Sequence, residues 1–249
     1  MQIDNVNIEG LYKYYNKFPA LEDINLSMKK GEIFGIIGSN GNGKSTLLNC
    51  ITGVLNYEKG KIFIDGTDLK KKPLQCKQKM AYCTDECNAY EIMTGEEYLT
   101  FVASVYKVDN KKFLEKYNKL LDMFNMRAHI KKLIKYYSHG TKQKIVLMAA
   151  MIHDPLIWIL DEPLVGLDAY SIKVLLDYFQ EYKKNGGTII ITIHDIDVAL
   201  KVCDRVAIIK EGHLAAQFNN TKDKTVKAKA LKIMSNDTLT KEKEVTNEA

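Results

Sequence analysis

The sequence predicts an α/β protein built on a parallel sheet, with a helical segment inserted into the middle of the chain. Three observations support this prediction. The short segments 33–37, 156–160 and 188–193 are apolar almost throughout, as expected of parallel strands that are buried on both faces. Helical patterns alternate with these segments, and between about 86 and 151 the apolar spacing is helical. A glycine-rich loop at 38–46 joins the first buried strand to a helix.

The N-terminal part of the chain is predicted to form strands. Apolar residues alternate over 2–14 and fall near every second position over 21–28, which predicts two strands, the second of them half-buried. The polar segment 29–32 is expected to turn the chain into the buried strand at 33–37. After the glycine loop and its helix, 61–66 is predicted as a short strand that ends at an Asp-Gly turn.

The middle of the chain carries the helical patterns. Thr94-Gly95-Glu96-Glu97 is typical of a capped helix start, and apolar stripes follow at 98–105 and 114–124. A third helix is predicted from about Thr141 to 150. We expect both stripes to pack in an ordinary helical core. The alternative is a groove that receives a helix of a partner protein.

The C-terminal part returns to alternating helices and strands. Helices are predicted at 171–183 and around 198–200, and a last strand is predicted at 205–209. From about residue 219 the chain is polar and rich in lysine. We expect a short helix at 225–234 within this tail and disorder in the rest of it.

Composition limits the class of protein. A chain of 249 residues can bury a substantial core as one large domain or two smaller lobes. The net charge is +5, and lysine supplies nearly all the positive charge because Arg127 and Arg205 are the only arginines. Arginine is the residue that reads phosphates and bases in a bidentate manner, so nucleic acid is disfavoured as the main partner. A positive face near a membrane surface fits the composition equally well.

The sequence also predicts the compartment. Residues 1–5 lack the basic start and apolar stretch of a signal peptide. No segment approaches the roughly 20 apolar residues that a spanning helix requires. The five cysteines are scattered without paired spacing, which favours reduced thiols over disulfides or a metal site. We therefore expect a cytoplasmic chain with no direct membrane span.

The glycine-rich loop has the spacing of a phosphate site, the pattern G-x-x-x-x-G-K-[ST] between a strand and a helix. Glycines allow the backbone N–H groups to surround phosphate oxygens, and the helix N-terminus adds unpaired donors and a partial positive charge. Lys44 is expected to reach the terminal phosphates and Ser45 to hold Mg²⁺. The alternative is an accidental glycine-rich turn. The loop consists of Gly38, Ser39, Asn40, Gly41, Asn42, Gly43, Lys44, Ser45 and Thr46.

Polar residues follow two of the buried strands. Asp161 and Glu162 come at the end of 156–160, and His194 ends the next buried strand. In open α/β sheets, ligands bind outside the carboxyl ends of the strands, where the glycine loop is also expected. Because adjacent strand residues point to opposite faces, we predict Asp161 for Mg²⁺ and Glu162 for the attacking water. The alternatives are solvated acids at a strand end and a structural histidine.

With these residues in place, the chain resembles the nucleotide-binding subunit of ABC transporters over nearly all of residues 1–215. Four further segments are similar to motifs of that family, in the same order. They are the signature segment Tyr137–Gln143, the second phosphate-site motif Leu156–Pro163, the D-loop Gly166–Asp168 and the histidine switch Ile193–Asp195.

The resemblance implies a P-loop NTPase fold, with a RecA-like core sheet, an N-terminal antiparallel β lobe and an inserted α-helical subdomain. It implies one ATPase domain at 1–218, whose core comprises 1–85 and 155–218 and whose helical subdomain comprises 86–154. A polar, partly disordered tail would follow at 219–249.

The resemblance also implies ATP and Mg²⁺ as ligands and assigns roles to residues. Glu162, His194 and Lys44 would be catalytic, and Tyr15 would stack on adenine. In a dimer, the signature residues Ser138 and Gly140 would contact the γ-phosphate held by the opposite subunit. Asp168 of the D-loop joins the nucleotide-binding residues.

The chain departs from the wider family at three positions. His139 replaces the first signature glycine and Thr141 the usual glutamine, although Ser138 and Gly140 remain. Asp85 occupies the place of the glutamine that approaches Mg²⁺ and the attacking water, and its carboxylate is also an oxygen ligand. We expect Asp85 to join Ser45 and Asp161 at the metal. The signature S-x-G-x-x-Q resembles ATPases of bacterial drug, bacteriocin and polysaccharide exporters.

The function implied is an ATP-hydrolysing subunit that powers a separate membrane permease, with export as the expected direction. The expected partners are that permease and a second ATPase subunit, identical or different, on the inner face of the cell membrane. Two alternatives remain. One is a soluble ABC ATPase of translation or DNA repair, which usually carries tandem ATPase units, zinc modules or long coiled coils. The other is a nucleotide-binding regulator that hardly hydrolyses.

Overall fold

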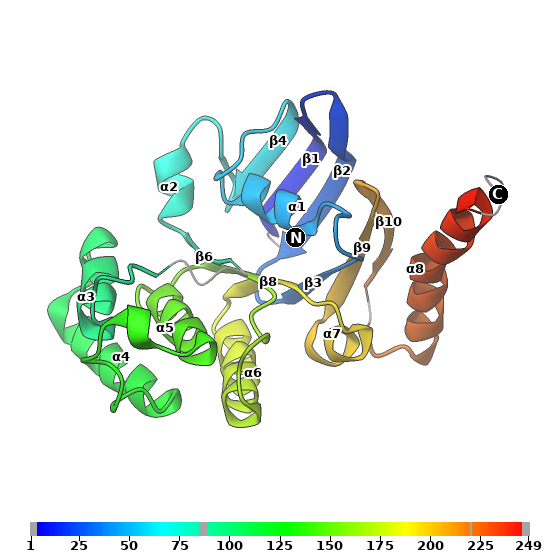
Figure 1. The fold of residues 1–249 in the computed structure, drawn as a ribbon. Coiled ribbons are helices and arrows are strands. Elements are labelled where there is room, and N and C mark those ends of the chain that lie inside the picture. The colour runs from blue at the N-terminus through cyan, green and yellow to red at the C-terminus, as the bar shows by residue number, and fades with distance from the viewer. Residues whose placement is uncertain (1–3, 85–88, 220, 246–249) are drawn as a thin grey trace.

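The computed structural model describes residues 4–84, 89–219 and 221–245, with side chains described as far as residue 235. Two sheets form its centre, and helices cover the larger one on both faces (Figure 1). Within the described part of the chain, no helix combines the length and the apolar character that crossing a membrane would need.

The larger sheet has six strands in the order β10-β9-β3-β8-β7-β6. All neighbouring pairs are parallel except β10 with β9. The central strands β3, β7 and β8 are buried at every position, which is why their sequences are apolar throughout. The predicted parallel α/β sheet is therefore confirmed. The strands are β3 (Ile33–Ile37), β6 (Met80–Cys83), β7 (Ile157–Asp161), β8 (Thr188–Thr192), β9 (Arg205–Lys210) and β10 (His213–Phe218).

The smaller sheet is antiparallel, in the order β2-β1-β4-β5, and comes mainly from the N-terminal segment. This confirms the expected N-terminal β lobe. Its long strands alternate buried and exposed positions, because one face packs on the core and the other meets solvent. The strands are β1 (Asp4–Tyr15), β2 (Phe18–Lys29), β4 (Lys59–Ile64) and β5 (Thr67–Asp68).

Polar caps fix where several helices begin. At Thr94 the predicted capping box is complete, since Glu97 N donates to Thr94 Oγ1 and Thr94 N to the Glu97 carboxylate. At later helices, the side chains of Ser138, Asp168 and Asp195 accept hydrogen bonds from backbone N–H groups of the first turn. The helices are α1 (Lys44–Ile51), α2 (Pro73–Lys77), α3 (Gly95–Val105), α4 (Asn110–Met123), the 3₁₀ turn η1 (Ile134–Tyr136), α5 (His139–Met151), α6 (Ala169–Lys184), α7 (Ile196–Val202) and α8 (Lys224–Val245).

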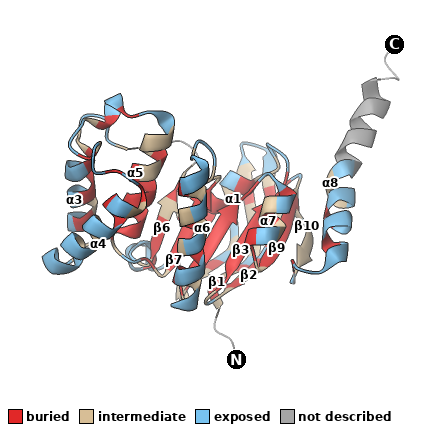
Figure 2. Ribbon diagram, turned by 90° about the horizontal axis from the view of Figure 1, so that it is seen from below, coloured by how far each residue is buried: buried red, intermediate tan, exposed pale blue. Residues whose placement is uncertain are grey.

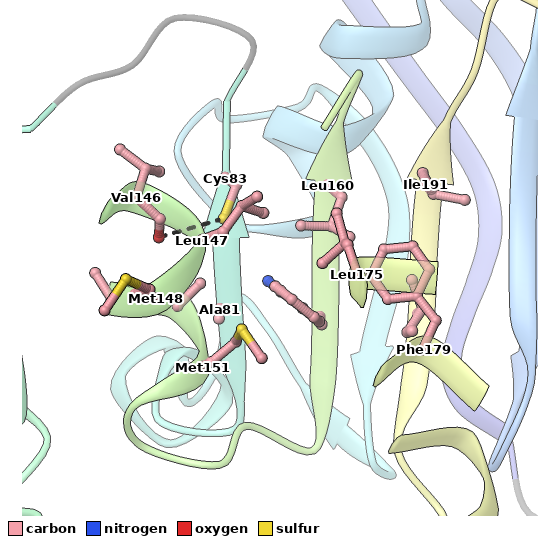
Figure 3. Close-up of a cluster of buried hydrophobic side chains, with 14 of the residues drawn as sticks. Ala81, Cys83, Val146, Leu147, Met148, Met151, Leu160, Leu175, Phe179 and Ile191 are labelled. Carbon is pink, nitrogen blue, oxygen red and sulfur yellow. Dashed lines mark hydrogen bonds between the residues drawn. The ribbon is translucent and has the colours of Figure 1, made fainter. Parts of the chain in front are cut away.

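The core lies on both faces of the larger sheet (Figure 2). On one face, α1 packs with the smaller sheet, and on the other face α6 and α7 cover the strands and α3, α4 and α5 group at one end (Figure 1). Figure 3 shows where α5 and α6 meet the sheet. Leu147 and Met151 approach Ala81 and Cys83 of β6, and Phe179 of α6 lies beside the strands.

Five elements were not predicted from the sequence: β5, α2, β6, η1 and β10. Each is short or mixed in polarity, so its periodicity does not distinguish it from a loop. The C-terminal helix α8 begins at Lys224 and runs to Val245, longer than the expected helix at 225–234. Its first turns are anchored by buried side chains, Val226 and Ala230.

A buried ion pair lies where the two sheets meet, at the start of β9 and just before β3. The Arg205 guanidinium at the start of β9 donates to Glu32 at 2.9 and 3.2 Å and to the Ser27 carbonyl of β2 at 3.1 Å. The two side chains are only 9% and 8% exposed. Burial raises the pKa of Glu32, while the hydrogen bond from Lys29 N–H and the Arg205 charge oppose that rise.

Replacing this arginine should destabilise the fold strongly. Arg205→Met leaves Glu32 buried without its partner, which costs about 3–5 kcal/mol in the free energy of unfolding. Urea denaturation measures the loss, and the double variant Glu32→Gln with Arg205→Met should recover part of it. Arg127→Met, at the exposed ion pair with Asp122, is the matched control and should change little. Equal losses in the two arginine variants would contradict the structural role of Arg205.

Candidate nucleotide site

The glycine loop leaves β3 at Gly38 and enters α1 at Lys44, as predicted. Two of its glycines cannot be replaced without a clash. A Cβ on Gly38 would lie 2.3 Å from the Ile209 carbonyl oxygen, and one on Gly43 would lie 2.7 Å from the Ala20 carbonyl oxygen. Gly43 also has φ of +99°, which L side chains rarely adopt. The loop therefore lies directly on the neighbouring backbone.

Asn42 holds this loop against the turn between β9 and β10. Its side-chain oxygen accepts a hydrogen bond from Glu211 N at 3.1 Å, and its carbonyl accepts one from Gly212 N at 3.2 Å. A loop held at both ends by strand and helix and at its middle by Asn42 is preorganised for a ligand.

The Lys44 ammonium lies inside the loop. Its Nζ donates to the Gly38 carbonyl at 2.8 Å and to the Ser39 carbonyl at 3.1 Å. Burial lowers the pKa of Lys44, and the charges of Glu162 and Asp161 oppose that change. A desolvated ammonium surrounded by backbone is suited to bind an anionic group such as a phosphate.

The two acids lie at the carboxyl end of β7, and Thr192 of β8 joins them. The Thr192 hydroxyl donates to Asp161 Oδ1 at 2.5 Å and accepts a hydrogen bond from Glu162 N at 2.9 Å. Asp161 is the last residue of β7 and is 1% exposed. Sequence reasoning missed Thr192, although a polar residue next to an Ile-Ile-Ile segment and near His194 was a usable signal.

The argument from strand alternation was wrong for Glu162. This residue follows the strand and has φ of +50°, an uncommon conformation for a residue other than glycine. The direction of its side chain is therefore set by a turn and not by the pleat of a strand. Such strained residues often occur at functional sites.

His194 completes the pocket. Its Nε2 lies 2.5 Å from Glu162 Oε1, which links the ends of β8 and β7. The resulting cavity has a volume of about 380 Å³. It is lined by Asn40, Gly41, Gly43, Lys44, Ser45, Thr46, Glu162 and His194. The structure thus brings together the loop, the glutamate and the histidine that the sequence placed at one edge of the sheet.

The predicted signature residues lie outside this cavity. Ser138 caps α5 by accepting from Thr141 N, and Gly140 lies so close to Gly166 that an added Cβ would be 2.5 Å from the Gly166 carbonyl oxygen. Asp168 caps α6 and pairs with Lys144 at 2.8 Å, which with the hydrogen bond from Ser171 N–H holds the pKa of Asp168 well below its usual range. The signature segment and the D-loop therefore pack against each other within the chain.

Tyr15 is another predicted site residue that does not line this cavity. Tyr15, at the end of β1, is 49% exposed, and the Lys13 ammonium lies 5.6 Å from its ring centroid. Asp85 lies outside the described residues, so its contact with Mg²⁺ stays a prediction.

The residues present fit a phosphate chain and a magnesium ion. The loop offers backbone donors and the Lys44 ammonium, and Ser45 and Asp161 carry oxygen ligands of the kind that Mg²⁺ prefers. In the described part of the chain, one side-chain hydrogen bond reaches Asp161, from Thr192, so this carboxylate keeps lone pairs for a cation. Glu162, paired with His194, is placed to act on a water molecule beside the loop.

Comparisons with known proteins give the family of the chain. The family model for ABC transporters matches residues 21–165, more than half of the chain. The chain is 32% identical to the linearmycin resistance ATP-binding protein LnrL of Bacillus subtilis, over 84% of this chain and 67% of that protein. It is 30% identical to the SkfA peptide export ATP-binding protein SkfE of the same organism, over 84% and 87% of the two chains. The solved structure of an ATP-binding subunit of an ABC transporter matches with a TM-score of 0.83 and 30% identity, covering 86% of this chain and 89% of that chain.

Fold, site and comparisons together define a nucleotide-binding subunit. The chain belongs to the ABC transporter family. It is an ATP-binding subunit of a transporter and an ATPase, whose P-loop NTPase fold is as the resemblance implied.

The hydroxyl of Thr192 should matter for hydrolysis more than for ATP binding. Thr192→Val preserves the shape of the side chain but removes the donor to Asp161 and the acceptor for Glu162 N. We expect the rate of ATP hydrolysis to fall roughly ten- to a hundredfold because the two acids lose their positions. The unfolding free energy should fall by about 1–3 kcal/mol because buried polar groups are left unsatisfied.

Thr188→Val provides the matched control. Thr188 lies at the opposite end of β8, and its hydroxyl bonds to Asn5 and to the Lys29 carbonyl. It should lose similar stability while the ATP hydrolysis rate of the folded protein stays unchanged. If both threonine variants hydrolyse ATP equally, Thr192 has no special role at the site.

Proposed function

We propose that this chain is the ATP-hydrolysing subunit that powers a separate membrane permease, and that the transport is export. The observation that carries the proposal is the cavity in which Glu162 and His194 lie 2.5 Å apart beside the phosphate loop and Lys44. A phosphate-binding loop by itself serves binding. The acid–histidine pair beside it adds a group that can take a proton from water, so the arrangement suits hydrolysis.

Export is supported by the names of similar proteins. One relative is described as conferring linearmycin resistance and another as serving SkfA peptide export. The second name states export, and resistance to a compound is a result that its export would produce. We extend this direction to the present chain, with the subunit on the inner face of the membrane.

The chain's own residues divide the work of hydrolysis. Lys44 and the loop N–H groups hold the phosphates, and Glu162 orients a water molecule and takes its proton. His194 holds the Glu162 carboxylate through the 2.5 Å contact and faces the same cavity. Mg²⁺, held by Ser45 and Asp161 with Asp85 as a further ligand, would neutralise charge that develops on the phosphates.

A second subunit completes the site. Ser138, Gly140 and Asp168 were expected at the nucleotide, yet none of them lines the cavity of this chain. In a closed two-fold dimer the same surface of each subunit serves both sites, so these residues would reach the ATP of the partner. ATP would favour the closed dimer because its contacts to Ser138 and Gly140 exist only there.

The permease is proposed to dock at the helical segment of 86–154. Tyr90, Ile92, Phe101 and Val105 are large apolar residues that remain exposed there. The rings of Tyr90 and Phe101 already meet edge to face, with centroids 5.6 Å apart. This aromatic surface suits an apolar helix of the permease. It follows Asp85 closely in the sequence, so a helix bound there would act next to a predicted ligand of Mg²⁺.

Replacing Glu162 should separate ATP binding from hydrolysis. Glu162→Gln keeps the shape of the side chain but removes the base, so steady-state hydrolysis should fall at least about a hundredfold while ATP still binds. A dimer should accumulate with ATP, and size-exclusion chromatography measures it. Glu211→Gln, at an exposed acid on the turn behind the loop, should hydrolyse at the parental rate. Parental activity in Glu162→Gln would refute the assigned base.

A large cation at Ser138 should block hydrolysis from a distance. Ser138→Arg adds bulk and charge to a surface outside this chain's own cavity, so it should impair hydrolysis only if that surface meets another subunit's ATP. ATP binding to the isolated subunit, measured by calorimetry, should be unchanged. Ser104→Arg, on the exposed end of α3, is the control. Unchanged hydrolysis in Ser138→Arg would argue against the shared site.

A further inference from the structure

A second, larger cavity lies at the edge of the core sheet opposite to the ATP pocket. Its volume is about 650 Å³, within the range of small-molecule sites. Its walls come from the segments that precede β3, β7 and β8, from α4 and from the end of α6. Each of these three strands ends at the ATP pocket, and a strand of five residues spans about 16 Å.

Four lysines and three acids line this cavity, which leaves an excess of one positive charge. Lys30 precedes β3, and Lys112, Lys116 and Lys119 project from one face of α4 at helical spacing. Lys116 pairs with Asp154, and Lys119 lies 3.3 Å from Glu181. Among the residues that the structure describes, Lys30 and Lys112 have no ion-pair partner. Of the three acids that line the cavity, Glu115 is the one that likewise has no ion-pair partner among the described residues.

One of the paired lysines, Lys116, is largely buried although its partner is exposed to solvent. Its side chain is 15% exposed, whereas that of its partner Asp154 is 74% exposed. Burial, with the Lys119 charge nearby, lowers the pKa of Lys116 to about 8. The negative charge of an anion that entered the cavity would favour the charged form of Lys116 and oppose this lowering.

The opposite wall is rigid and partly aromatic. Tyr178 and Tyr182 of α6 stack with their ring centroids 6.2 Å apart, and the Tyr182 hydroxyl donates to the Pro155 carbonyl. Gly187 has to be glycine here, because an added Cβ would lie 2.3 Å from the Tyr182 ring. This wall offers an apolar surface beside the ammonium groups, as small-molecule sites usually do.

We propose that this cavity binds a small organic anion, with a phosphate or carboxylate group held by Lys30 and Lys112 and an apolar body against Tyr178 and Tyr182. The site is distinct from the ATP pocket, since the two cavities share no lining residue. A ligand there bridges α4 of the helical segment and α6, whose first turn is capped by Asp168. The ligand therefore contacts the helical segment and the core of the chain at once.

The only tryptophan of the chain provides the readout. Trp158 on β7 is buried, and its ring meets Tyr178 and Tyr182 with centroids 6.1 Å away in each case. Phenyl phosphate and benzoate serve as probes, titrated against the full chain carrying Lys44→Ala so that the phosphate loop does not compete. Saturable calorimetric binding, with a change in Trp158 fluorescence, is expected for at least one probe.

Variants of the lining lysines decide the question. Lys30→Gln and Lys112→Gln should each weaken binding about tenfold, because each removes one charge-assisted hydrogen bond. Lys111→Gln, at the neighbouring position on α4 outside the cavity, should bind like the parent. No saturable binding of either probe by calorimetry would overturn the proposal. Binding that is equal in Lys30→Gln, Lys112→Gln and Lys111→Gln would overturn it as well.

Discussion

The parallel pairing of β3, β8 and β7 is the constraint on which the rest of the structure depends. In this register Thr192 of β8 lies level with Ile36 of β3 and with Asp161 of β7. The three strands therefore end together, and the glycine loop, the two acids and His194 leave the sheet at one edge. Parallel strands need crossover connections, and these connections supply the helices that cover both faces. The same alignment makes the strands begin together, beside the lysine-lined cavity at the other edge.

Hydrogen bonds across this edge turn neighbouring strand ends into a site. Thr192 joins the ends of β7 and β8 by hydrogen bonds. The contact between His194 and Glu162 joins the same two segments just beyond the ends of the strands. Asn42 ties the loop to the turn after β9. Each link crosses between segments far apart in sequence, so the geometry of the site depends on the folded sheet. The signature segment and the D-loop form a separate packed unit, which is why we infer a site completed by a second copy.

The buried strands, the loop and the motif residues could be predicted because each has a local signal. An Ile-Ile-Ile segment predicts a buried strand, and a G-x-x-x-x-G-K-S pattern predicts a phosphate loop, without reference to distant residues. A polar residue beside the Ile-Ile-Ile segment was a usable signal for Thr192, but its hydrogen-bond partners depend on the register across β8 and β7. The left-handed turn at Glu162 depends on what surrounds it and has no local signal. The same holds for the Arg205–Glu32 pair, whose members are 173 residues apart. The predicted domain limits and the roles of the site residues stay predictions.

The central claim is that each ATP site is built from two subunits, and mixing two inactive variants tests it directly. Lys44→Ala removes the ammonium of the phosphate loop and keeps Ser138. Ser138→Arg keeps the phosphate loop and blocks the signature segment. In a mixed dimer, one site receives an intact loop from one subunit and an intact signature from the other. With random pairing at equal amounts, half of the dimers are mixed and each has one good site, so about a quarter of the parental hydrolysis rate should return. A mixture no more active than the two variants measured separately would contradict the claim.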